Sequence, residues 1–351
     1  MLKLAAPIWR ANGWQQKIIS TGQELGPFAP ELAMAGYEIS FCPETKNPTW
    51  IRTYRQELRR LSPSVIHDHA EGLSLIKVGI PALMHKRVFR TVHNAFEFDG
   101  WLRVKKLIER RIARLLGVKT ITISQSVFSN ESKRFANRST LCWNWFDDSH
   151  FRPPSDKERI QARGELGLGS HEVVLLTVGN GNDTKNYSAL IRSLPALIGA
   201  TSTIKYVMVG HEHPEGKEKQ AAREAGVDQC VEFAGPQQNV QKYLWAADVY
   251  VMPSLYEGFG LAAVEALATG IPCIFTDCPG LRDFKDFPLK IAWTSPDPTS
   301  LGNTLRQVIF HSNFRERNRL NSDFVRDYFA VKRRATAYSD LWNQSLSAGL
   351  K

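Results

Sequence analysis

The sequence lacks any apolar run near the roughly 20 residues that a membrane-spanning helix requires, and it does not open on the charged-then-apolar pattern of a signal peptide. It also has few cysteines, and the five are scattered, odd in number and never spaced as Cys-x-x-Cys. We therefore expect reduced, buried thiols. These absences predict a cytoplasmic protein whose contact with a membrane, if it has one, is peripheral.

Acidic residues are scarce in the first half of the 351-residue chain. Residues 1–150 contain 22 Lys and Arg against 13 Asp and Glu, a net charge of +9 out of +10 for the whole chain. Such a basic half predicts an anionic partner, for which a membrane surface, a lipid phosphate and a nucleic acid are the candidates. The length exceeds what one hydrophobic core usually serves, so two domains are expected.

One stretch of the second half, residues 254–266 (SLYEGFGLAAVEA), combines acids and glycines at a turn. An apolar strand pattern precedes it, and an Ala- and Leu-rich helical pattern follows it until Gly270. Glycines let a backbone approach a ligand closely, and the amides that open a helix suit a phosphate. Glu257 in the loop and Glu265 one turn into the helix can then hold hydroxyl groups of two sugars.

The stretch and its flanks resemble the Glu-x7-Glu signature of retaining GT-B glycosyltransferases, in particular the large GT4 family. Residues 247–254 (ADVYVMPS) and 270–274 (GIPCI) stand in the family's order. An acidic cap on an ordinary helix would explain two glutamates alone but not these flanks. The resemblance covers nearly the whole chain and implies an α/β fold of GT-B type, with two doubly wound Rossmann-like domains facing a central cleft.

The resemblance further implies that the protein is an enzyme, a hexosyltransferase. It would move a sugar with retention from a nucleotide-sugar to a glycan or lipid-linked acceptor, in bacterial surface polysaccharide biosynthesis. Glu265 is expected to hold the ribose, and Glu257 is expected to act on the donor sugar by positioning and electrostatics. The diphosphate is expected against the amides of Gly258, Phe259, Gly260 and Leu261. No Asp-x-Asp motif is present, and neither a metal nor another cofactor is expected.

A second set of donor contacts is expected in residues 179–186, which follow a continuous apolar strand pattern. The family commonly has Gly-Arg at the start of this loop and a lysine further on, both reaching the donor diphosphate. Gly179 and Lys185 match, whereas Asn180 stands in place of the arginine. Losing a planar, bidentate phosphate partner predicts weaker donor binding, unless a basic residue elsewhere supplies the charge.

The first half begins with an expected strand at residues 2–8, followed by a loop and by a helix up to about Ala35. Residues 37–41 are the next expected strand, which completes a βαβ unit. In the family, the loop after the first strand is rich in glycine and faces the acceptor and the donor phosphate. Gly13 and Trp14 are expected there, on the acceptor side, with Trp14 either stacking on a sugar or lipid group or packing.

Histidines follow two further expected strands. His93 ends the strand at residues 89–94, and ligands gather at such ends of open α/β sheets. It matches the family's Thr-Val-His sequence, which implies a catalytic hydrogen bond to the transferred sugar. The sequence His67-Asp68-His69 suggests a metal site, but the two histidines share one face of a strand while Asp68 takes the other. No further ligand cluster is evident, so no metal is expected.

Residues 101–116 are strongly basic and amphipathic. The apolar positions recur at steps of three and four: Trp101, Val104, Ile108, Ile112 and Leu115. One interpretation packs this stripe on the sheet, with Lys and Arg outward. The other places the helix at an anionic membrane. Both hold together if the stripe faces the core and the basic flank faces lipid head groups.

Three segments are expected along the chain. An acceptor-side Rossmann-like domain is expected at residues 1–152, and a nucleotide-sugar-binding one at residues 153–325. A polar, proline-containing connection that begins at Arg152 places the first boundary. Residues 326–351 are expected to form a helix that crosses back to the first domain, as the family's tail does.

Three other functions stay open on the sequence. The basic half suggests a nucleic-acid-binding protein, although the neutral second half with its donor motif argues against a nucleic-acid partner. Asn180 and the glycine-poor loop at Gly13 suggest a catalytically weak or partner-dependent protein that binds nucleotide-sugar. A nucleotide-sugar epimerase on the same fold would release an altered nucleotide-sugar with no acceptor present.

Overall fold

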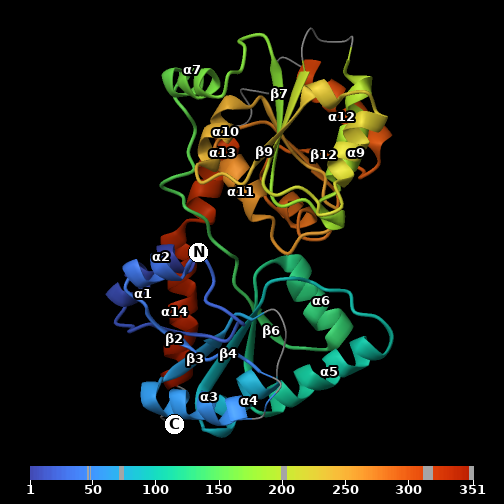
Figure 1. Cartoon of the computed structure of the whole chain (residues 1–351). Helices are drawn as coiled ribbons and strands as arrows, with labels where there is room; N and C mark the ends of the chain where they lie inside the picture. Colours follow the sequence, from blue (N-terminus) through green and yellow to red (C-terminus); the bar gives the residue numbers. More distant parts are fainter. Residues whose placement is uncertain (46, 48, 71–74, 199–203, 311–318, 348–351) are drawn as a thin grey trace. The chain divides into compact units, whose positions relative to one another are not determined.

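The computed structural model describes residues 1–45, 47, 49–70, 75–198, 204–310 and 319–347, and it divides the chain into two units. Unit 1 comprises Met1–Trp145 and Val331–Lys351, and unit 2 comprises Phe146–Ala330. The sequence placed these joins after residues 152 and 325. Because the last segment belongs to unit 1, the chain passes from unit 1 to unit 2 and returns (Figure 1).

Unit 1 is built from parallel strands and helices. Two strands pair with each other: β1 (Lys17–Ser20) and β2 (Glu38–Phe41). A second sheet has the order β3-β4-β5-β6, formed by β3 (Val65–Asp68), β4 (Arg87–Val92), β5 (Lys119–Thr122) and β6 (Ser139–Leu141). The helices are α1 (Leu2–Ala11), α2 (Ala29–Met34), α3 (Thr49–Leu61), α4 (Leu75–Leu83), α5 (Gly100–Leu115), α6 (Gln125–Phe135) and α14 (Val331–Ser347).

The start of the chain differs from the expectation, because residues 2–8 lie in helix α1 and not in a strand. Ala5 and Trp9 are both buried and stand four residues apart, the spacing of one helix face. The first strand is β1, which is short and only partly buried, so its pattern was weak. Consequently Gly13 and Trp14 precede the first strand, and their expected placement after it is wrong.

Tryptophans join the two ends of unit 1. Trp9 of α1 lies 5.0 Å from Trp342 and 5.9 Å from Trp145, measured between ring centroids. Its Nε1 donates to the carbonyl oxygen of Ala335 at 2.7 Å. Trp14 lies 5.2 Å from Trp342, so it packs in this cluster. Since such aromatic pairs add to the burial of large apolar side chains, helix α14 is part of the core of unit 1.

Helix α5 does not pack its apolar stripe on the sheet. Trp101 is 77% exposed and Leu115 is 83% exposed, whereas Arg110 and Ala113 are the buried residues of this helix. The interpretation in which the stripe faces the core is therefore wrong. The physical reason is the buried Glu131 of α6, to which Arg110 donates two hydrogen bonds of 2.8 and 2.6 Å.

Unit 2 contains a six-stranded parallel sheet in the order β12-β11-β10-β7-β8-β9. The strands are β7 (Val173–Val178), β8 (Ile204–Val209), β9 (Val231–Gly235), β10 (Val249–Met252), β11 (Cys273–Thr276) and β12 (Ala292–Thr294). The chain runs outward from β7 in one direction and from β10 in the other, so the strand order reverses between them. Ligands of such sheets bind beside this switch point, at the carboxyl ends of the strands.

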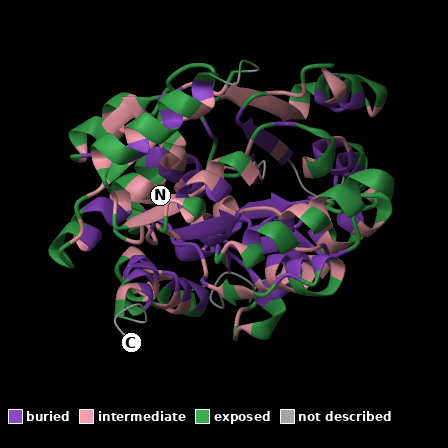
Figure 2. Ribbon diagram, turned by 90° about the horizontal axis from the view of Figure 1, so that it is seen from below, coloured by how far each residue is buried: buried purple, intermediate pink, exposed green. Residues whose placement is uncertain are grey.

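Helices cover both faces of this sheet (Figure 1). The α-helices are α7 (Asp156–Glu165), α8 (Tyr187–Ser193), α9 (Lys217–Glu224), α10 (Val240–Ala246), α11 (Leu261–Ala268), α12 (Pro298–Phe310) and α13 (Arg319–Tyr328). Short 3-10 helices are η1 (Asp183–Lys185), η2 (Leu194–Ala196), η3 (Asp228–Cys230) and η4 (Arg282–Asp286). Every residue of β10 and β11 is buried, as a parallel sheet covered on both sides requires. Figure 2 shows buried residues gathered inside the molecule, with exposed residues mainly on the outer helices and loops.

None of the described helices, in either unit, has the length and apolar character needed to cross a bilayer.

Candidate active site

Two loops meet at the carboxyl edge of the unit 2 sheet, at the switch point between β7 and β10. The loop after β7 contains η1, and the loop after β10 contains Glu257. Leu255 donates its amide to the carbonyl oxygen of Thr184 at 2.8 Å. Asn186 donates through Nδ2 to the carbonyl oxygen of Pro253 at 3.1 Å. These hydrogen bonds hold the two loops in a fixed relation to each other.

Lys185 and Glu257 form an ion pair between these loops, with 2.7 Å between Nζ and Oε1. Ser254 donates its hydroxyl to the same oxygen at 2.7 Å. The side chains of Lys185 and Glu257 are only 19% and 12% exposed, so their attraction is screened less than on an open surface. The fold thus brings together two residues that the resemblance assigned separately to the donor.

The loop after β11 supports the backbone of Glu257, and sequence patterns did not single it out. The Glu257 amide donates to the carbonyl oxygen of Pro279 at 3.0 Å. Gly280 has a φ of +87°, and a Cβ at this position would overlap the carbonyl oxygen of Glu257. Only glycine both adopts this positive φ easily and leaves room for the Glu257 carbonyl. A Pro-Gly pair directly after a buried strand was the signal that could have found it.

Helix α11 begins at Leu261, which makes Glu265 its fifth residue. Its hydrogen-bond ladder starts with the amide of Ala263, which donates to the carbonyl oxygen of Gly260 at 2.9 Å. The first amides of an α-helix point out of its end, and helix-opening amides suit an anion. The helix start therefore lies directly after the loop that holds Glu257.

The side chains of Glu265 and Phe259 have different environments. Glu265 is partly buried, and burial raises the pKa of its carboxyl to about 8. A carboxyl with this pKa is largely protonated at neutral pH, so it can donate as well as accept a hydrogen bond. The ring of Phe259 is buried 5.4 Å from that of Phe329 and 6.1 Å from that of Phe284. Phe259 can therefore offer a ligand only its backbone.

The Asn180 side chain accepts a hydrogen bond that an arginine side chain could not accept. Its Oδ1 accepts a hydrogen bond from the His211 amide at 3.1 Å, whereas a guanidinium can only donate. Beside it, a Cβ at Gly210 would overlap the carbonyl oxygen of Gly179. The loops after β7 and β8 are therefore packed backbone against backbone at this point.

Three histidines gather at the carboxyl ends of β3 and β4 in unit 1. His69 Nδ1 lies 3.2 Å from His93 Nε2, and His67 Nε2 lies 2.7 Å from Thr91 Oγ1. Burial lowers the pKa of His69 to about 3 and that of His93 to about 4. Both rings are therefore neutral at pH 7. In the described ranges, no group of three or more His, Cys, Asp or Glu side chains is placed to hold a metal ion.

The loop that follows the first strand of unit 1 is residues 21–28, between β1 and α2. It contains Gly22 and Gly26, which are both exposed. Sequence reasoning missed this loop because helix α1 was interpreted as the first strand, which moved the expected loop to Gly13. The available signal was the Gly-x3-Gly spacing ahead of Pro27 and a second helical segment.

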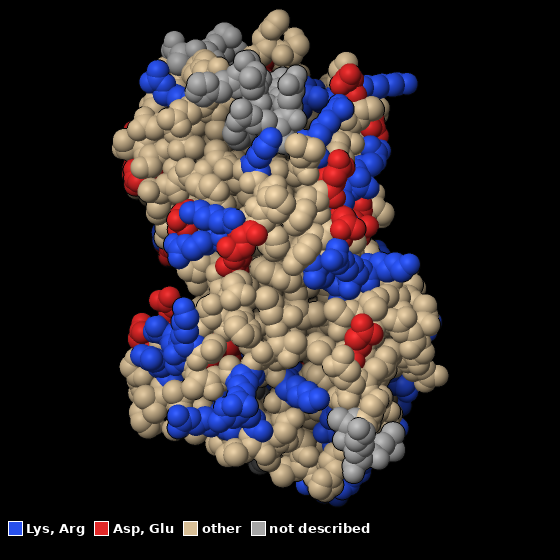
Figure 3. All heavy atoms as spheres, turned by 180° about the vertical axis from the view of Figure 1, so that it is seen from behind, with Lys and Arg blue, Asp and Glu red and all other residues tan. Residues whose placement is uncertain are grey.

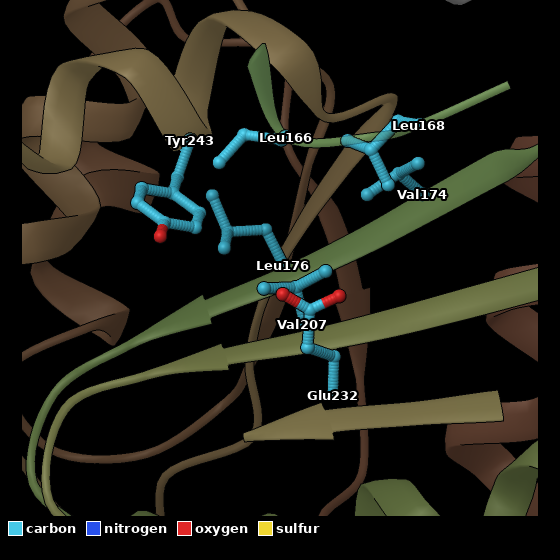
Figure 4. A pocket seen from close by; sticks show the side chains of 7 residues that line it. All are labelled: Leu166, Leu168, Val174, Leu176, Val207, Glu232 and Tyr243. Carbon is cyan, nitrogen blue, oxygen red and sulfur yellow. The ribbon is translucent and has the colours of Figure 1, made fainter. Parts of the chain in front are cut away.

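A small cavity in unit 2 lies away from these loops (Figure 4). Its volume of about 10 Å³ corresponds to about one water molecule. It is lined by Leu166, Leu168, Val174, Leu176, Val207, Glu232 and Tyr243. Val174 and Glu232 stand near the amino ends of β7 and β9, the edge of the sheet opposite Glu257. The cavity is therefore a packing gap and not the candidate site.

Residues 158–322 match the family model of glycosyl transferases group 1. Over 186 residues the chain is 32% identical to a D-inositol 3-phosphate glycosyltransferase of a Nocardioides species, an alignment that covers 48% of this chain and 40% of that protein. Over 144 residues it is 29% identical to the lipopolysaccharide core biosynthesis mannosyltransferase LpsB of Rhizobium meliloti, covering 40% of each. The chain thus spans about two fifths of the length of these curated relatives.

The solved structure of Anabaena Alr3699/HepE in complex with UDP and glucose is similar in fold, with a TM-score of 0.82 and 15% identity. The similarity covers 97% of this chain and 94% of that one. It confirms the expected α/β fold with two Rossmann-like sets of parallel strands. The matched family segment contains every donor-side residue described above, from Gly179 to Glu265. Through this segment the chain is similar to the group 1 glycosyltransferases, and the structure as a whole has a GT-B fold.

Proposed function

We propose that this chain is a retaining glycosyltransferase of GT4 type that moves a hexose-type sugar from a nucleotide-sugar to a glycan or lipid-linked acceptor. The observation that carries the proposal is the Lys185–Glu257 ion pair at the switch point, next to the amides that open α11. A nucleotide-sugar needs a cation and backbone amides to bind its phosphates. It also needs a hydrogen-bond acceptor, such as a carboxylate, for the hydroxyl groups of its sugar. The similarity to LpsB, which is named for lipopolysaccharide core biosynthesis, supports a role in bacterial surface polysaccharide biosynthesis. The similar Anabaena structure, solved with UDP and glucose, supports a nucleotide-sugar donor.

Donor binding would open the ion pair. Lys185 would turn its Nζ to the diphosphate, and Glu257 would accept hydrogen bonds from the sugar hydroxyls while keeping that from Ser254. Both charged groups gain a new partner as they lose the old one, so neither stays buried and unpaired. Glu265, protonated at neutral pH, would both donate to and accept from the ribose hydroxyls.

In the proposed transfer, the bond between the anomeric carbon and the diphosphate breaks, and negative charge develops on the leaving phosphate oxygen. The amides of residues 258–261 and Lys185 would stabilise this charge without reorganisation. The acceptor oxygen would form the new bond to the anomeric carbon from the face that the diphosphate leaves, while its proton passes to the leaving phosphate oxygen. This attack retains the configuration without a covalent intermediate on Glu257. His93 of unit 1, a neutral ring, is the proposed hydrogen-bond partner of the transferred sugar. The scheme requires neither a metal nor a cofactor.

We propose that the loop at residues 21–28, and not Gly13 and Trp14, faces the acceptor. This loop follows the first strand and carries two exposed glycines, as the acceptor-facing loop of the resembling family does. The net charge of +9 on residues 1–150 supports a lipid-linked acceptor at an anionic membrane surface. We therefore propose a cytoplasmic protein that binds the membrane peripherally, and we expect no nucleic-acid partner.

One observation favours a second candidate, a catalytically weak or partner-dependent nucleotide-sugar-binding protein. Because the side-chain oxygen of Asn180 accepts from the His211 amide, the loop after β7 has no guanidinium where the family commonly has one. A lysine alone is a point charge, and it binds a diphosphate less strongly than a lysine with a bidentate arginine. Under this candidate, the donor binds but transfer needs a partner protein.

Metal-free calorimetric titration with UDP-, GDP- and ADP-sugars tests the donor site. The wild type is expected to bind one nucleotide class, and Lys185→Ala to weaken that binding roughly ten- to a hundredfold, because a charged hydrogen bond is lost. The matched control is Lys205→Ala, which removes a 2.6 Å ion pair with Glu232 near the other end of the sheet and should leave donor binding unchanged. A folded wild type that binds none of these donors would overturn the proposal.

Transfer itself is tested by adding lipid-linked acceptors to the wild type with its bound donor class. Nuclear magnetic resonance of the product should show the anomeric configuration of the donor, because the proposed attack is from the leaving-group face. An inverted product would contradict the retaining mechanism. Donor binding with transfer only after a partner protein is added would establish the second candidate instead.

A further inference from the structure

Helix α5 presents an apolar stripe to solvent. Its members are Trp101, Val104, Ile108, Ile112 and Leu115, with exposed fractions of 77, 44, 45, 38 and 83%. At steps of three and four residues, these side chains follow one side of the helix. Phe96, in the loop before the helix, is also 42% exposed. A continuous apolar surface of this kind marks an interaction site, whereas singly scattered exposed residues do not.

The opposite side of α5 is fixed to unit 1 by a buried ion pair. Arg110, whose side chain is 5% exposed, binds the fully buried Glu131 of α6 with 2.6 Å between Nη2 and Oε1. The guanidinium lies 4.0 Å from the ring centroid of Phe135, and Asn137 donates to Glu131 at 2.7 Å. Turning the stripe inward would break this arrangement and leave a buried carboxylate without its cation, which is strongly unfavourable. The fold of unit 1 therefore keeps the stripe exposed.

Two cationic side chains flank the stripe, and two more lie elsewhere on the same helix. Lys105, Arg111, Arg103 and Arg114 are all exposed. By helical spacing, Lys105 and Arg111 lie on either side of the stripe. Within the described part of the chain, none of these four forms an ion pair, whereas Lys106 is held by Glu109 at 2.9 Å. The face of unit 1 drawn in Figure 3 likewise shows groups of Lys and Arg with fewer Asp and Glu among them.

We propose that α5 is the surface by which unit 1 binds an anionic phospholipid membrane. The helix would lie in the plane of the interface, with Trp101 and Leu115 inserted between lipids and the flanking cations at the phosphates. An apolar stripe bordered by Lys and Arg and ending in tryptophan is the composition of interfacial helices. The inference rests on the membrane contact proposed above, but it does not depend on glycosyl transfer.

A bilayer fits this surface better than other polyanions or a protein do. A nucleic acid would neutralise the cations but offers no apolar phase for five aliphatic and aromatic side chains. A protein partner would need a groove that is apolar along its floor and acidic along both rims. An anionic bilayer supplies the apolar interior and the negative head groups together, and it needs no matched shape.

Co-sedimentation of the full chain with vesicles tests the inference. The vesicles are phosphatidylcholine with and without phosphatidylglycerol. We expect the wild type to bind the anionic vesicles, and the double variant Trp101→Ser, Leu115→Ser to bind them roughly tenfold or more weakly, because two large apolar side chains no longer enter the lipid. The matched control is Ile160→Ser, which changes a residue 72% exposed on α7 of unit 2 and should bind as the wild type does.

Each outcome has a separate meaning. Anionic-vesicle binding that the stripe variant retains would overturn the role of α5 while leaving the membrane contact in place. No wild-type binding to anionic vesicles would overturn both. Loss of binding in Lys105→Glu, Arg111→Glu alone, with the stripe variant unaffected, would overturn insertion and show a purely electrostatic attachment. Calorimetric donor binding should be equal in all variants, so a failure of the proposed function is recognised independently.

Discussion

The backbone of Gly280 packs directly against that of Glu257 in the candidate site. Its φ of +87° favours glycine, and a Cβ there would overlap the carbonyl oxygen of Glu257. Gly280→Ala is therefore expected to lower the free energy of unfolding by roughly 2–3 kcal/mol. It should also weaken donor binding, because Glu257 must shift to make room. Urea denaturation and donor titration measure the two effects.

The control for this substitution is Gly226→Ala. Gly226 has a φ of +66°, but a Cβ there would meet nothing within 4 Å. The Gly226→Ala variant therefore measures only the loss of stability from placing alanine in the left-handed conformation, about 1 kcal/mol. Its donor binding should be unaffected. Equal losses of stability in the two variants would show that the contact with Glu257 has no energetic weight.

Glu265 makes stability depend on pH in a defined direction. Burial raises the pKa of its carboxyl from 4.5 to about 8. The unfolded chain loses this proton near pH 4.5, whereas the folded chain keeps it until about pH 8. Between these values the folded state binds more protons, so this group makes the free energy of unfolding fall as the pH rises.

Glu265→Gln should remove this contribution, because glutamine is neutral at every pH. Denaturation curves measured across the interval are expected to show the variant gaining stability relative to the wild type as the pH rises from 4.5 to 8. The lowered pKa values of His69 and His93 act oppositely, since their contribution is lost as the pH falls from the unfolded value of 6.5 towards about 4. Parallel curves for wild type and variant would refute the raised pKa of Glu265.

At the scale of elements, Asp248 joins helix α7 to the sheet of unit 2. Its Oδ1 lies 2.8 Å from Nη2 of Arg159, and its Oδ2 lies 3.1 Å from Nη1 of Arg163. The Val174 amide donates to Oδ2 at 2.9 Å. Asp248→Ala is expected to lower the free energy of unfolding by roughly 2–3 kcal/mol, because partly buried donors lose their acceptor.

Urea denaturation monitored by tryptophan fluorescence measures this loss. Glu224→Ala is the comparison, since it removes an ion pair with Arg192 in which both side chains are about half exposed. Exposed pairs contribute about 1 kcal/mol or less. A loss for Asp248→Ala as small as that for Glu224→Ala would contradict its structural role.

The amphipathic helices α1 and α5 show what the spacing of apolar residues cannot predict about a helix. In α5 the spacing of apolar residues predicted the helix and its stripe, but the stripe is exposed. In α1 the four-residue spacing of Ala5 and Trp9 was present, yet a short apolar run was interpreted as a strand. Periodicity reports which residues share a face, and it does not report what that face contacts.

At the scale of the whole molecule, α14 completes unit 1 from the far end of the chain. Trp342 is 7% exposed and packs on Trp9 and Trp14. Trp342→Ala is expected to cost about 3–5 kcal/mol of stability. In differential scanning calorimetry, we expect the unfolding of unit 1 to move to lower temperature while that of unit 2 stays in place.

The comparison variant is Trp101→Ala, which removes a tryptophan that is 77% exposed. Its effect on stability should stay within about 0.5 kcal/mol. Similar shifts for the two variants, or a shift of the unit 2 transition by Trp342→Ala, would contradict the packing of α14 in the core of unit 1.

The sequence by itself determined the resemblance to glycosyltransferases, the fold class and most of the donor-side candidates, because their information is local. Residues 249–270 carry a strand, a glycine turn and a helix start within one short stretch, and turn chemistry and helix stops act over such distances. The loop at residues 179–186 follows its own strand in the same way. The roles of these residues in transfer stay predictions.

Tertiary structure alone decided the contacts between distant segments. Lys185 pairs with Glu257 across 72 positions, Asn180 accepts from the His211 amide, and Gly280 supports Glu257 from a third loop. It also decided the rotation of α5, through the Arg110–Glu131 pair 21 positions apart. An apolar stripe looks the same in sequence whether it faces a protein core or a lipid surface, since both are apolar. Whether the stripe of α5 is exposed depends on the other face of the helix, which the fold buries through Arg110.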